Sequence, residues 1–227
     1  SLDQDHVLVI DDWRLADGTT ISADFNNRHD IAHDGRWGNV ITTNNMVVRE
    51  LSARPGERIR LRFVNVANGR VFVPAVSHAA ELVAVDGMSL TTPIPYEKFE
   101  LSPGNRIDLE ITVPENVSEI LIADAFSRNP TTLVKISVVG ELVDSRVEDY
   151  PADIHIPKWS NHSLLDAQPD VVYRLGALGG GMHGGMMASQ WVINDRLYGE
   201  DVPHNLAPEE VAKVRFINET RSEEHTS

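Results

Sequence analysis

The side chains best suited to bind a metal gather in a glycine-rich segment, LGGGMHGGMM, at residues 178–187. Its candidate ligands are Met182, His183, Met186 and Met187. Thioether sulfur is a soft ligand that favours Cu(I), and imidazole also binds copper. The segment is therefore a candidate for transient Cu(I) binding. The alternative is a flexible connector between domains, because glycine-rich segments behave as flexible linkers.

Other histidines also invite a metal interpretation. His29 and His33 are four residues apart, a spacing that suits two ligands on one face of a helix. We predict no helix there, because the stretch is loop-like and carries Asp30 and Asp34, so a solvated loop is expected. His78 precedes a predicted strand and is expected to be a hydrogen-bonded structural histidine rather than a ligand.

Cysteine is absent from all 227 residues, and no two of the nine histidines are two residues apart. The absence of cysteine excludes disulfides, thiolate metal sites and cysteine nucleophiles within this sequence. The histidine spacing excludes a His-x-His pair.

The remaining conspicuous residues have structural interpretations. Asp86 and Gly87 are expected to form a tight turn. Arg62 and Arg106 fall on the outward faces of predicted strands, where solubility explains them. The four tryptophans are expected to pack in the core or between domains rather than to stack on a substrate, since large aromatic side chains dominate buried contacts. They are Trp13, Trp37, Trp159 and Trp191.

The elements that must position these residues are predicted to be β-strands. Apolar and polar residues alternate over residues 58–63 and 106–113, which places one set on a core face and the other in water. Turn-forming pairs such as Pro55-Gly56 and Pro103-Gly104 separate the strands. Many short strands with regular turns favour an antiparallel sandwich or barrel. The further predicted strands are 7–10, 39–43, 82–85, 120–123, 133–139 and 171–175.

The charge and hydropathy of the chain exclude several partners. There are 34 acidic and 20 basic residues, a formal net charge of −14, with no long run of Lys or Arg. Such a chain repels nucleic acid and anionic membrane surfaces. No apolar run approaches the length of a membrane span. The opening SLDQDH lacks a Met and a basic segment, so we identify no signal peptide in it.

One pattern occurs twice. The first copy reads GNVITTNN and then ARPGERIRLRFVN, and the second reads QWVINDRLYG and then LAPEEVAKVRFIN. Residues 63–65 match residues 216–218 at an offset of 153 residues, and a repeat of that length is a whole domain. The sequence therefore predicts one complete β-domain and the opening strands of a second, and we expect the native chain to continue.

We expect four segments along the chain. Residues 1–141 form a β-sandwich domain, residues 142–168 a proline-containing linker, and residues 169–220 the beginning of the next domain, including the Gly/Met-rich loop 178–187. Residues 221–227, RSEEHTS, match one translated frame of a common sequencing adapter and are expected to be a non-native tail. The alternative for this last segment is an ordinary polar tail.

An ordered series of segments resembles the bacterial three-domain multicopper oxidases of the laccase-like and copper-resistance type. The series corresponds to the second domain and the start of the third, and it covers nearly all of residues 5–220. No single segment is decisive, but their order and spacing are fairly specific. They are VLVIDDWRL (7–15), GRWGNVITTNN (35–45), RPGERIRLRFVNVANGR (54–70), ELVAVDGMSL (81–90), LSPGNRIDLEITVP (101–114) and WVINDRLYG (191–199).

This resemblance implies cupredoxin-like Greek-key β-sandwich domains in a periplasmic or secreted enzyme. The parent would carry a type 1 copper and a trinuclear copper cluster. It would couple one-electron oxidation of a phenolic substrate or Cu(I) to four-electron reduction of dioxygen to water. The family places its copper ligands in the first and third domains. These residues would then be a copper-free, inactive scaffold with no catalytic or cofactor-binding residue, and its partners would be the missing first and third domains.

Two alternatives stay open. The first is a cupredoxin homologue without copper ligands that acts as a structural or cell-division protein. Such proteins and the oxidases both keep the middle domain. A His-Cys-His run downstream would indicate the oxidase. A two-domain copper nitrite reductase is the other alternative, although the long linker and the Met-rich loop favour three domains.

Overall fold

In the computed structural model, the chain folds as two compact units. Unit 1 comprises Ser1–Phe25 and Gly35–Ile156, and unit 2 comprises Asn26–Asp34 and Pro157–Ser227. The residues described are 2–25, 27–32, 35–143, 168–178, 190–197, 199–200, 204–208, 210 and 212–219.

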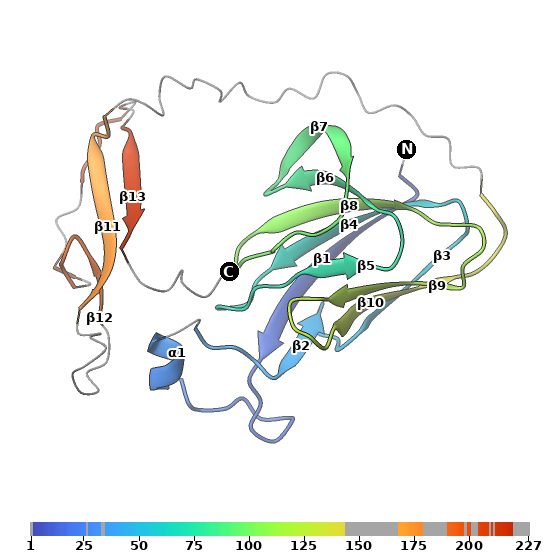
Figure 1. Ribbon diagram of the computed structural model, residues 1–227, viewed down its shortest axis with the longest axis horizontal. Helices are drawn as coiled ribbons and strands as arrows, with labels where there is room; N and C mark the ends of the chain where they lie inside the picture. Colours follow the sequence, from blue (N-terminus) through green and yellow to red (C-terminus); the bar gives the residue numbers. More distant parts are fainter. Residues whose placement is uncertain are drawn as a thin grey trace. The chain divides into compact units, whose positions relative to one another are not determined.

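Unit 1 is a sandwich of two β-sheets (Figure 1). The six-stranded sheet has the order β2(Val40–Thr43), β1(Gln4–Trp13), β4(Arg58–Asn65), β8(Arg106–Thr112), β6(Glu81–Val85), β7(Met88–Pro95). The four-stranded sheet has the order β3(Arg49–Ala53), β10(Thr131–Val138), β9(Glu119–Asp124), β5(Pro74–Val76). The β-sandwich predicted from the sequence is confirmed.

Two of the strand pairs in unit 1 are parallel. β1 pairs with β4, and β3 pairs with β10, in parallel registers. The prediction of an antiparallel sandwich is therefore correct for most pairs and wrong for these two. The reason is the connectivity: β2 reverses the chain beside β1, β3 crosses to the other sheet, and β4 then returns in the direction of β1.

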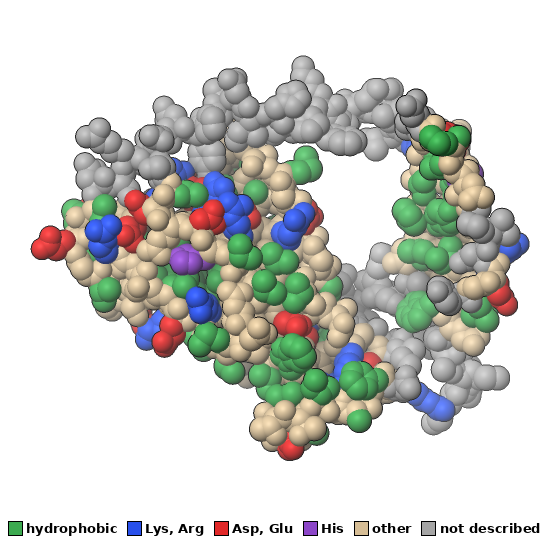
Figure 2. Space-filling model, turned by 180° about the vertical axis from the view of Figure 1, so that it is seen from behind, with side chains coloured by type: hydrophobic (Ala, Val, Ile, Leu, Met, Phe, Trp, Pro, Cys, Tyr) green, Lys and Arg blue, Asp and Glu red, His purple; other side chains and the backbone are tan. Residues whose placement is uncertain are grey.

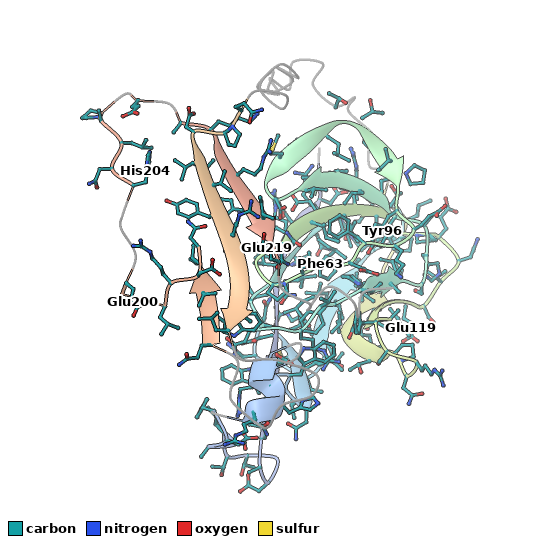
Figure 3. The ribbon with its side chains drawn as sticks, turned by 60° about the vertical axis from the view of Figure 1, so that its left-hand side comes forward. Phe63, Tyr96, Glu119, Glu200, His204 and Glu219 are labelled. Carbon is teal, nitrogen blue, oxygen red and sulfur yellow. The ribbon has the colours of Figure 1, made fainter. Side chains whose placement is uncertain are left out.

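The core lies between the sheets and follows the period-two pattern. In β4, Ile59, Leu61 and Phe63 are at most 1% exposed, and the intervening arginines lie on the outer face. The four-stranded sheet contributes Ile120 and Ile122 to the same cluster. Full burial of one such side chain stabilises the fold by about 1.5–3 kcal/mol. Figure 3 labels Phe63 inside the sandwich.

Tyr96, which packs against this core, connects the two sheets (Figure 3). It follows β7 of the larger sheet, and its hydroxyl donates to the carbonyl of Pro74 in β5 of the smaller sheet at 2.5 Å. Its backbone N–H donates to the carbonyl of Ala80 at 2.9 Å. Burial raises the pKa of Tyr96 to about 12, so the hydroxyl stays a donor across the physiological range.

A short helix corrects the loop predicted around His29. Residues Arg28–Ala32 form α1, a single helical turn. Asn27 Oδ1 accepts the backbone N–H of His29 at 2.9 Å, which satisfies one of the donors left without a partner at a helix N-terminus. Asp30 lies in the first turn, where a carboxylate is favoured. This local capping was not apparent from periodicity alone.

The strands of unit 2 repeat part of unit 1. β11(Val171–Leu178) pairs antiparallel with β12(Gln190–Ile193) and parallel with β13(Val214–Asn218), in the order β12-β11-β13. Unit 1 has the same arrangement in β2-β1-β4. The registers also agree. The equivalent cross-strand triples are Thr43-Ile10-Asn65 and Ile193-Leu175-Asn218.

The turn after β2 is repeated in atomic detail after β12. Its first residue is Asn44 in unit 1 and Asn194 in unit 2, with φ of 50° and 52°, and the next residue also has a positive φ. Each Asn Oδ1 accepts one backbone N–H of the adjacent strand at 2.8 Å, from Val9 and from Arg174. Asparagine suits this role because it tolerates a left-handed conformation while bonding to backbone.

Within the residues described, no helix is long and apolar enough to cross a membrane.

Candidate functional site

The histidines described do not assemble into a metal centre. His6 Nε2 lies 2.8 Å from Gln4 Oε1, and His78 Nδ1 lies 2.8 Å from Ser77 Oγ. The part of the chain that the structure describes has no group of three or more His, Cys, Asp or Glu side chains that could hold a metal. A type 1 copper needs a cysteine thiolate, and the sequence has none. The residues present therefore do not fit a blue-copper site.

Several predicted positions lie outside the described residues. They include the Cu(I) candidates Met182, His183, Met186 and Met187. The others are His33, Asp34, Trp159, residues 144–167 of the predicted linker and the expected tail at 221–227.

A buried charge cluster lies where the two sheets meet. Asp12 ends the inward-facing row of β1, and Asp124 ends that of β9 in the other sheet. Both carboxyl side chains are 1% exposed. Arg70 lies between them, with Nη1 3.9 Å from Asp12 Oδ2 and Nη2 3.7 Å from Asp124 Oδ2. One guanidinium therefore links the ends of two strands from opposite sheets.

Backbone groups hold both carboxylates in place. Gly38 N–H donates to Asp12 Oδ2 at 2.5 Å. A Cβ at Gly38 would lie 2.4 Å from the backbone nitrogen of Trp13, so this close approach requires glycine. Asp124 Oδ1 accepts the N–H groups of Val73 at 2.9 Å and Phe126 at 3.1 Å. The loops around the cluster are thus tied to the strand ends.

Burial raises the pKa of Asp12 above its usual range, and the Gly38 N–H and the charge of Arg70 oppose that shift. The negative charge of this carboxylate is therefore held at a cost. A buried carboxylate of this kind has either a structural or a functional role. The described contacts of Asp12 favour a structural role, because its partners Gly38 and Arg70 both belong to unit 1.

Aromatic rings cover the arginine of this cluster. The Arg70 guanidinium carbon lies 5.2 Å from the centroid of the Trp37 ring and 5.6 Å from that of Phe72. Trp37 packs edge-on against Phe126 at 5.5 Å. These distances allow cation–π attraction, and they agree with the packing role predicted for Trp37. By contrast, Trp191 is 49% exposed among the described residues.

A second charged array covers the outer face of the six-stranded sheet. Glu110 is 3% exposed and pairs with both Arg58, at 2.5 Å, and Arg60. Arg62 pairs with Asp5 at 2.6 Å and with Asp108 at 2.9 Å. These ion pairs connect β1, β4 and β8, so Arg62 links neighbouring strands as well as contributing to a soluble surface. Figure 2 shows blue and red side chains intermingled over one face of this unit.

The pKa directions within this array follow local contacts. The hydrogen bond from Arg62 lowers the pKa of Asp5, and the same bond raises the pKa of Arg62. Burial raises the pKa of Asp108, which the charges of Arg62 and Arg60 oppose.

Arg106 and Asp86 fix the tight turn predicted from the sequence. Asp86 and Gly87 have φ of 50° and 82°, and Asp86 Oδ1 accepts the backbone N–H of Arg106 at 2.8 Å. Arg106 Nη2 donates to the Asp86 carbonyl at 2.8 Å. The predicted turn is confirmed, and solubility alone does not account for Arg106.

The sequence analysis did not identify Asp12 and Asp124, the two buried carboxylates that face Arg70. A signal was present, because each continues a buried period-two row: Leu8 and Ile10 precede Asp12, and Ile120 and Ile122 precede Asp124. An acidic residue at the next inward position indicates a buried, paired carboxylate.

Comparison with known proteins identifies the relatives. Residues 4–137 match the sequence profile of the family described as Multicopper oxidase. No curated protein sequence matches the chain.

Solved structures share the fold. A multi-copper oxidase from Pseudomonas thermotolerans aligns with a TM-score of 0.60 at 23% identity, over 78% of this chain and 41% of that one. The laccase-like multi-copper oxidase CueO from Ochrobactrum sp. gives 0.60 at 22% identity, over 77% and 39%. A variant of McoA multicopper oxidase from Aquifex aeolicus gives 0.63 at 16% identity, over 96% and 50%. The chain spans about two fifths of the length of the first of these relatives.

Proposed function

The chain belongs to the multicopper oxidase family, and from this membership we propose that residues 1–227 are the copper-free scaffold part of a larger copper oxidase. The observation that carries the proposal is the family match over residues 4–137 in a chain that contains no cysteine. Family membership implies copper in the parent enzyme. The donor set of this chain cannot supply a blue-copper site.

The proposed parent reaction joins two half-reactions. Four phenolic or Cu(I) substrates each lose one electron, and one dioxygen takes up the four electrons and four protons to give two waters. Bound type 1 and trinuclear coppers would supply this electron transfer from sites outside residues 1–227. The Ochrobactrum relative is described as acting on lignin model compounds and lignosulfonate, which supports a phenolic substrate.

The proposed role of this part is to fix the separation and orientation of neighbouring domains. Metal ligands from different domains must be held to about 0.5 Å to form one site, which requires a stiff support. The apolar core, the Asp12–Arg70–Asp124 cluster and the outer charge array provide that stiffness in unit 1. We propose the first and third domains as its partners and a periplasmic or secreted location for the parent.

The domain boundaries and the Met-rich loop are part of this proposal. Residues 1–141 would form the middle domain, residues 142–168 the linker and residues 169–220 the start of the third domain. Met182, His183, Met186 and Met187 would bind Cu(I) weakly and transiently.

A copper titration tests the scaffold assignment. The chain is expressed with Cu(II), dialysed and assayed for bound copper, visible absorption and oxidase activity. We expect no intense blue absorption band and no oxidase turnover, because no thiolate is present. One tightly bound blue copper per chain would contradict the assignment.

Sequencing the gene downstream separates the competing functions. A His-Cys-His run there supports the oxidase. Its absence supports a copper-free structural or cell-division protein, and a two-domain gene supports a copper nitrite reductase.

A further inference from the structure

The loop between β4 and β5 holds the one Asn-Gly pair of the sequence, at residues 68–69. In such a pair the backbone nitrogen of glycine can attack the side-chain amide of the preceding asparagine, because glycine has no Cβ to hinder the approach. Asn68 is exposed and Gly69 is half-buried, and both lie in a bend. The two reacting groups are therefore accessible to water and hydroxide.

Hydrogen bonding does not restrain either reacting group. Within the described part of the chain, neither the Asn68 side chain nor the Gly69 N–H has a hydrogen-bond partner. Other asparagines of unit 1 differ. Asn39 and Asn44 each use the oxygen and the nitrogen of the side chain to bond backbone groups. Their amides are held in place, whereas that of Asn68 is free to rotate towards Gly69.

The loop that carries this pair is fixed at both ends by Asn65. Asn65 is fully buried, and its Oδ1 accepts the N–H of Ala67 at 2.9 Å. Its Nδ2 donates to the carbonyl of Arg70 at 2.8 Å. The Asn-Gly pair thus lies at the tip of a short loop whose length is matched to one side chain. A change of backbone length at the tip must displace one of the two ends.

One of those ends is Arg70, the central residue of the Asp12–Arg70–Asp124 cluster. Its guanidinium lies 3.9 Å from one buried carboxylate and 3.7 Å from the other. It also lies over the rings of Trp37 and Phe72. Buried charges need their partners close by, because an uncompensated carboxylate in the interior is strongly destabilising. The position of Arg70 is therefore sensitive to the loop that carries it.

We propose that Asn68 is a site of spontaneous deamidation, and that its isoaspartyl product weakens the Asp12–Arg70–Asp124 cluster.

The reaction proceeds through a five-membered succinimide. The Gly69 nitrogen gives its proton to hydroxide and attacks Cγ of Asn68. The N–Cγ bond forms, the Cγ–Nδ2 bond breaks, and the side-chain nitrogen takes a proton from water and leaves as ammonia. A water then opens the ring at one of its two carbonyl carbons, which gives an aspartyl or an isoaspartyl residue. Overall one water is consumed and one ammonia is released, without a change of oxidation state.

The isoaspartyl product changes both the length and the charge of the loop. Its main chain passes through Cγ, so one additional methylene group separates Asn65 from Arg70. The product also carries a carboxylate two residues from Arg70. We expect the longer loop to displace the guanidinium from its buried partners, and unit 1 to lose stability as the modification accumulates.

Ageing of the whole chain tests the modification itself. The chain is incubated at mildly alkaline pH, sampled over time and digested with trypsin, which releases residues 63–70, FVNVANGR. We expect Asn68 to gain the mass difference between –OH and –NH₂, at a rate that rises with hydroxide concentration. Asn65 in the same peptide is buried and bonded and should stay unchanged. Asn116 is also exposed, but it precedes the branched Val117 and should react far more slowly.

Two variants assign the reaction to this pair. Asn68→Gln requires a larger ring and should abolish the reaction at this position. Gly69→Ala places a Cβ beside the attacking nitrogen and should slow the reaction about tenfold. An unmodified Asn68 in the aged wild type, or equal rates in wild type and Gly69→Ala, would overturn the assignment.

Urea unfolding tests the effect on the cluster. Wild type should unfold at a lower urea concentration after ageing, whereas Asn68→Gln aged in parallel should be unchanged. Asn68→Asp supplies the new charge without the additional methylene group, so a smaller shift is expected from this variant than from the isoaspartyl chain. An aged wild type that is deamidated and yet as stable as fresh protein would overturn the link to Arg70.

Discussion

The two three-stranded frameworks, β2-β1-β4 and β12-β11-β13, share order, direction and register but differ in burial. Leu8 lies opposite Phe63 in unit 1, and both are fully buried beneath the second sheet. Their equivalents Tyr173 and Phe216 stack on each other at 5.5 Å, yet Phe216 is 67% exposed. Local turn chemistry and backbone pairing therefore determine the framework, whereas burial depends on a second layer.

The largest expected contrast comes from removing the equivalent phenylalanines. Phe63→Ala should lower the free energy of unfolding of unit 1 by about 3–5 kcal/mol, since it leaves a cavity in a close-packed core. Phe216→Ala removes a mostly exposed ring and should lower the free energy of unfolding of unit 2 far less. Urea unfolding of both variants measures the difference. Equal losses of unfolding free energy would show that the Phe216 ring is buried in solution, which would contradict the difference in burial between the two units.

A second contrast concerns how stability depends on pH. Unit 1 has a titratable side chain, Asp12, at the position that Ala177 occupies in unit 2. Burial in the folded state raises the pKa of Asp12, so the folded protein binds this proton more tightly than the unfolded chain does. The resulting stability is fully present below the unfolded pKa of about 4 and is lost as pH rises through the folded pKa. Asp12→Asn keeps an acceptor for the Gly38 N–H. Its stability relative to wild type should therefore increase as pH rises from about 4 towards neutrality.

Asp5→Asn is the control of opposite sign for this experiment. Arg62 lowers the pKa of Asp5, so the stability it contributes is present above the unfolded pKa and lost as pH falls. Relative to wild type, this variant should be less stable at neutral pH and should approach it in acid. If both variants change in the same direction, the assigned causes are wrong.

A smaller and nearly equal effect is expected from the two turns. Asn44→Ala and Asn194→Ala each remove the bond to one strand amide, Val9 or Arg174, worth about 1 kcal/mol. Hydrogen exchange of these two amides should accelerate in the corresponding variant only. A change in one unit without its counterpart in the other would show that the turns are not equivalent.

The smallest expected effect concerns the connections that follow β1 and β11. The connection after β1, residues 14–39, has no methionine, whereas the connection after β11, residues 179–189, holds three. Replacing Met182, Met186 and Met187 by serine should abolish weak Cu(I) binding, because the soft ligands are lost. Competition with a chromogenic Cu(I) chelator measures this. Unchanged competition would leave the segment as a connector.

How far the sequence predicts the structure depends on side-chain alternation. β4 and β8 were predictable because their apolar residues occur at every second position. β7 was not, since Pro93 and Pro95 argue against a strand, and β5 has only three residues. The Asp12–Arg70–Asp124 cluster was missed because Arg70 comes from a loop whose path depends on tertiary packing. The absence of a thiolate copper ligand followed from composition alone.

The parallel pairing of β1 with β4 also has a consequence for how unit 1 folds. Gln4 lies opposite Ile59, so this pair can form only after the chain has closed a loop of more than fifty residues. Closing such loops costs entropy before any contact is gained, and proteins rich in such pairs fold in milliseconds to seconds. The hairpin of β6 and β7 is local and can form early. We therefore expect the β1–β4 seam to close late, as the slow step that commits the sandwich to its native topology.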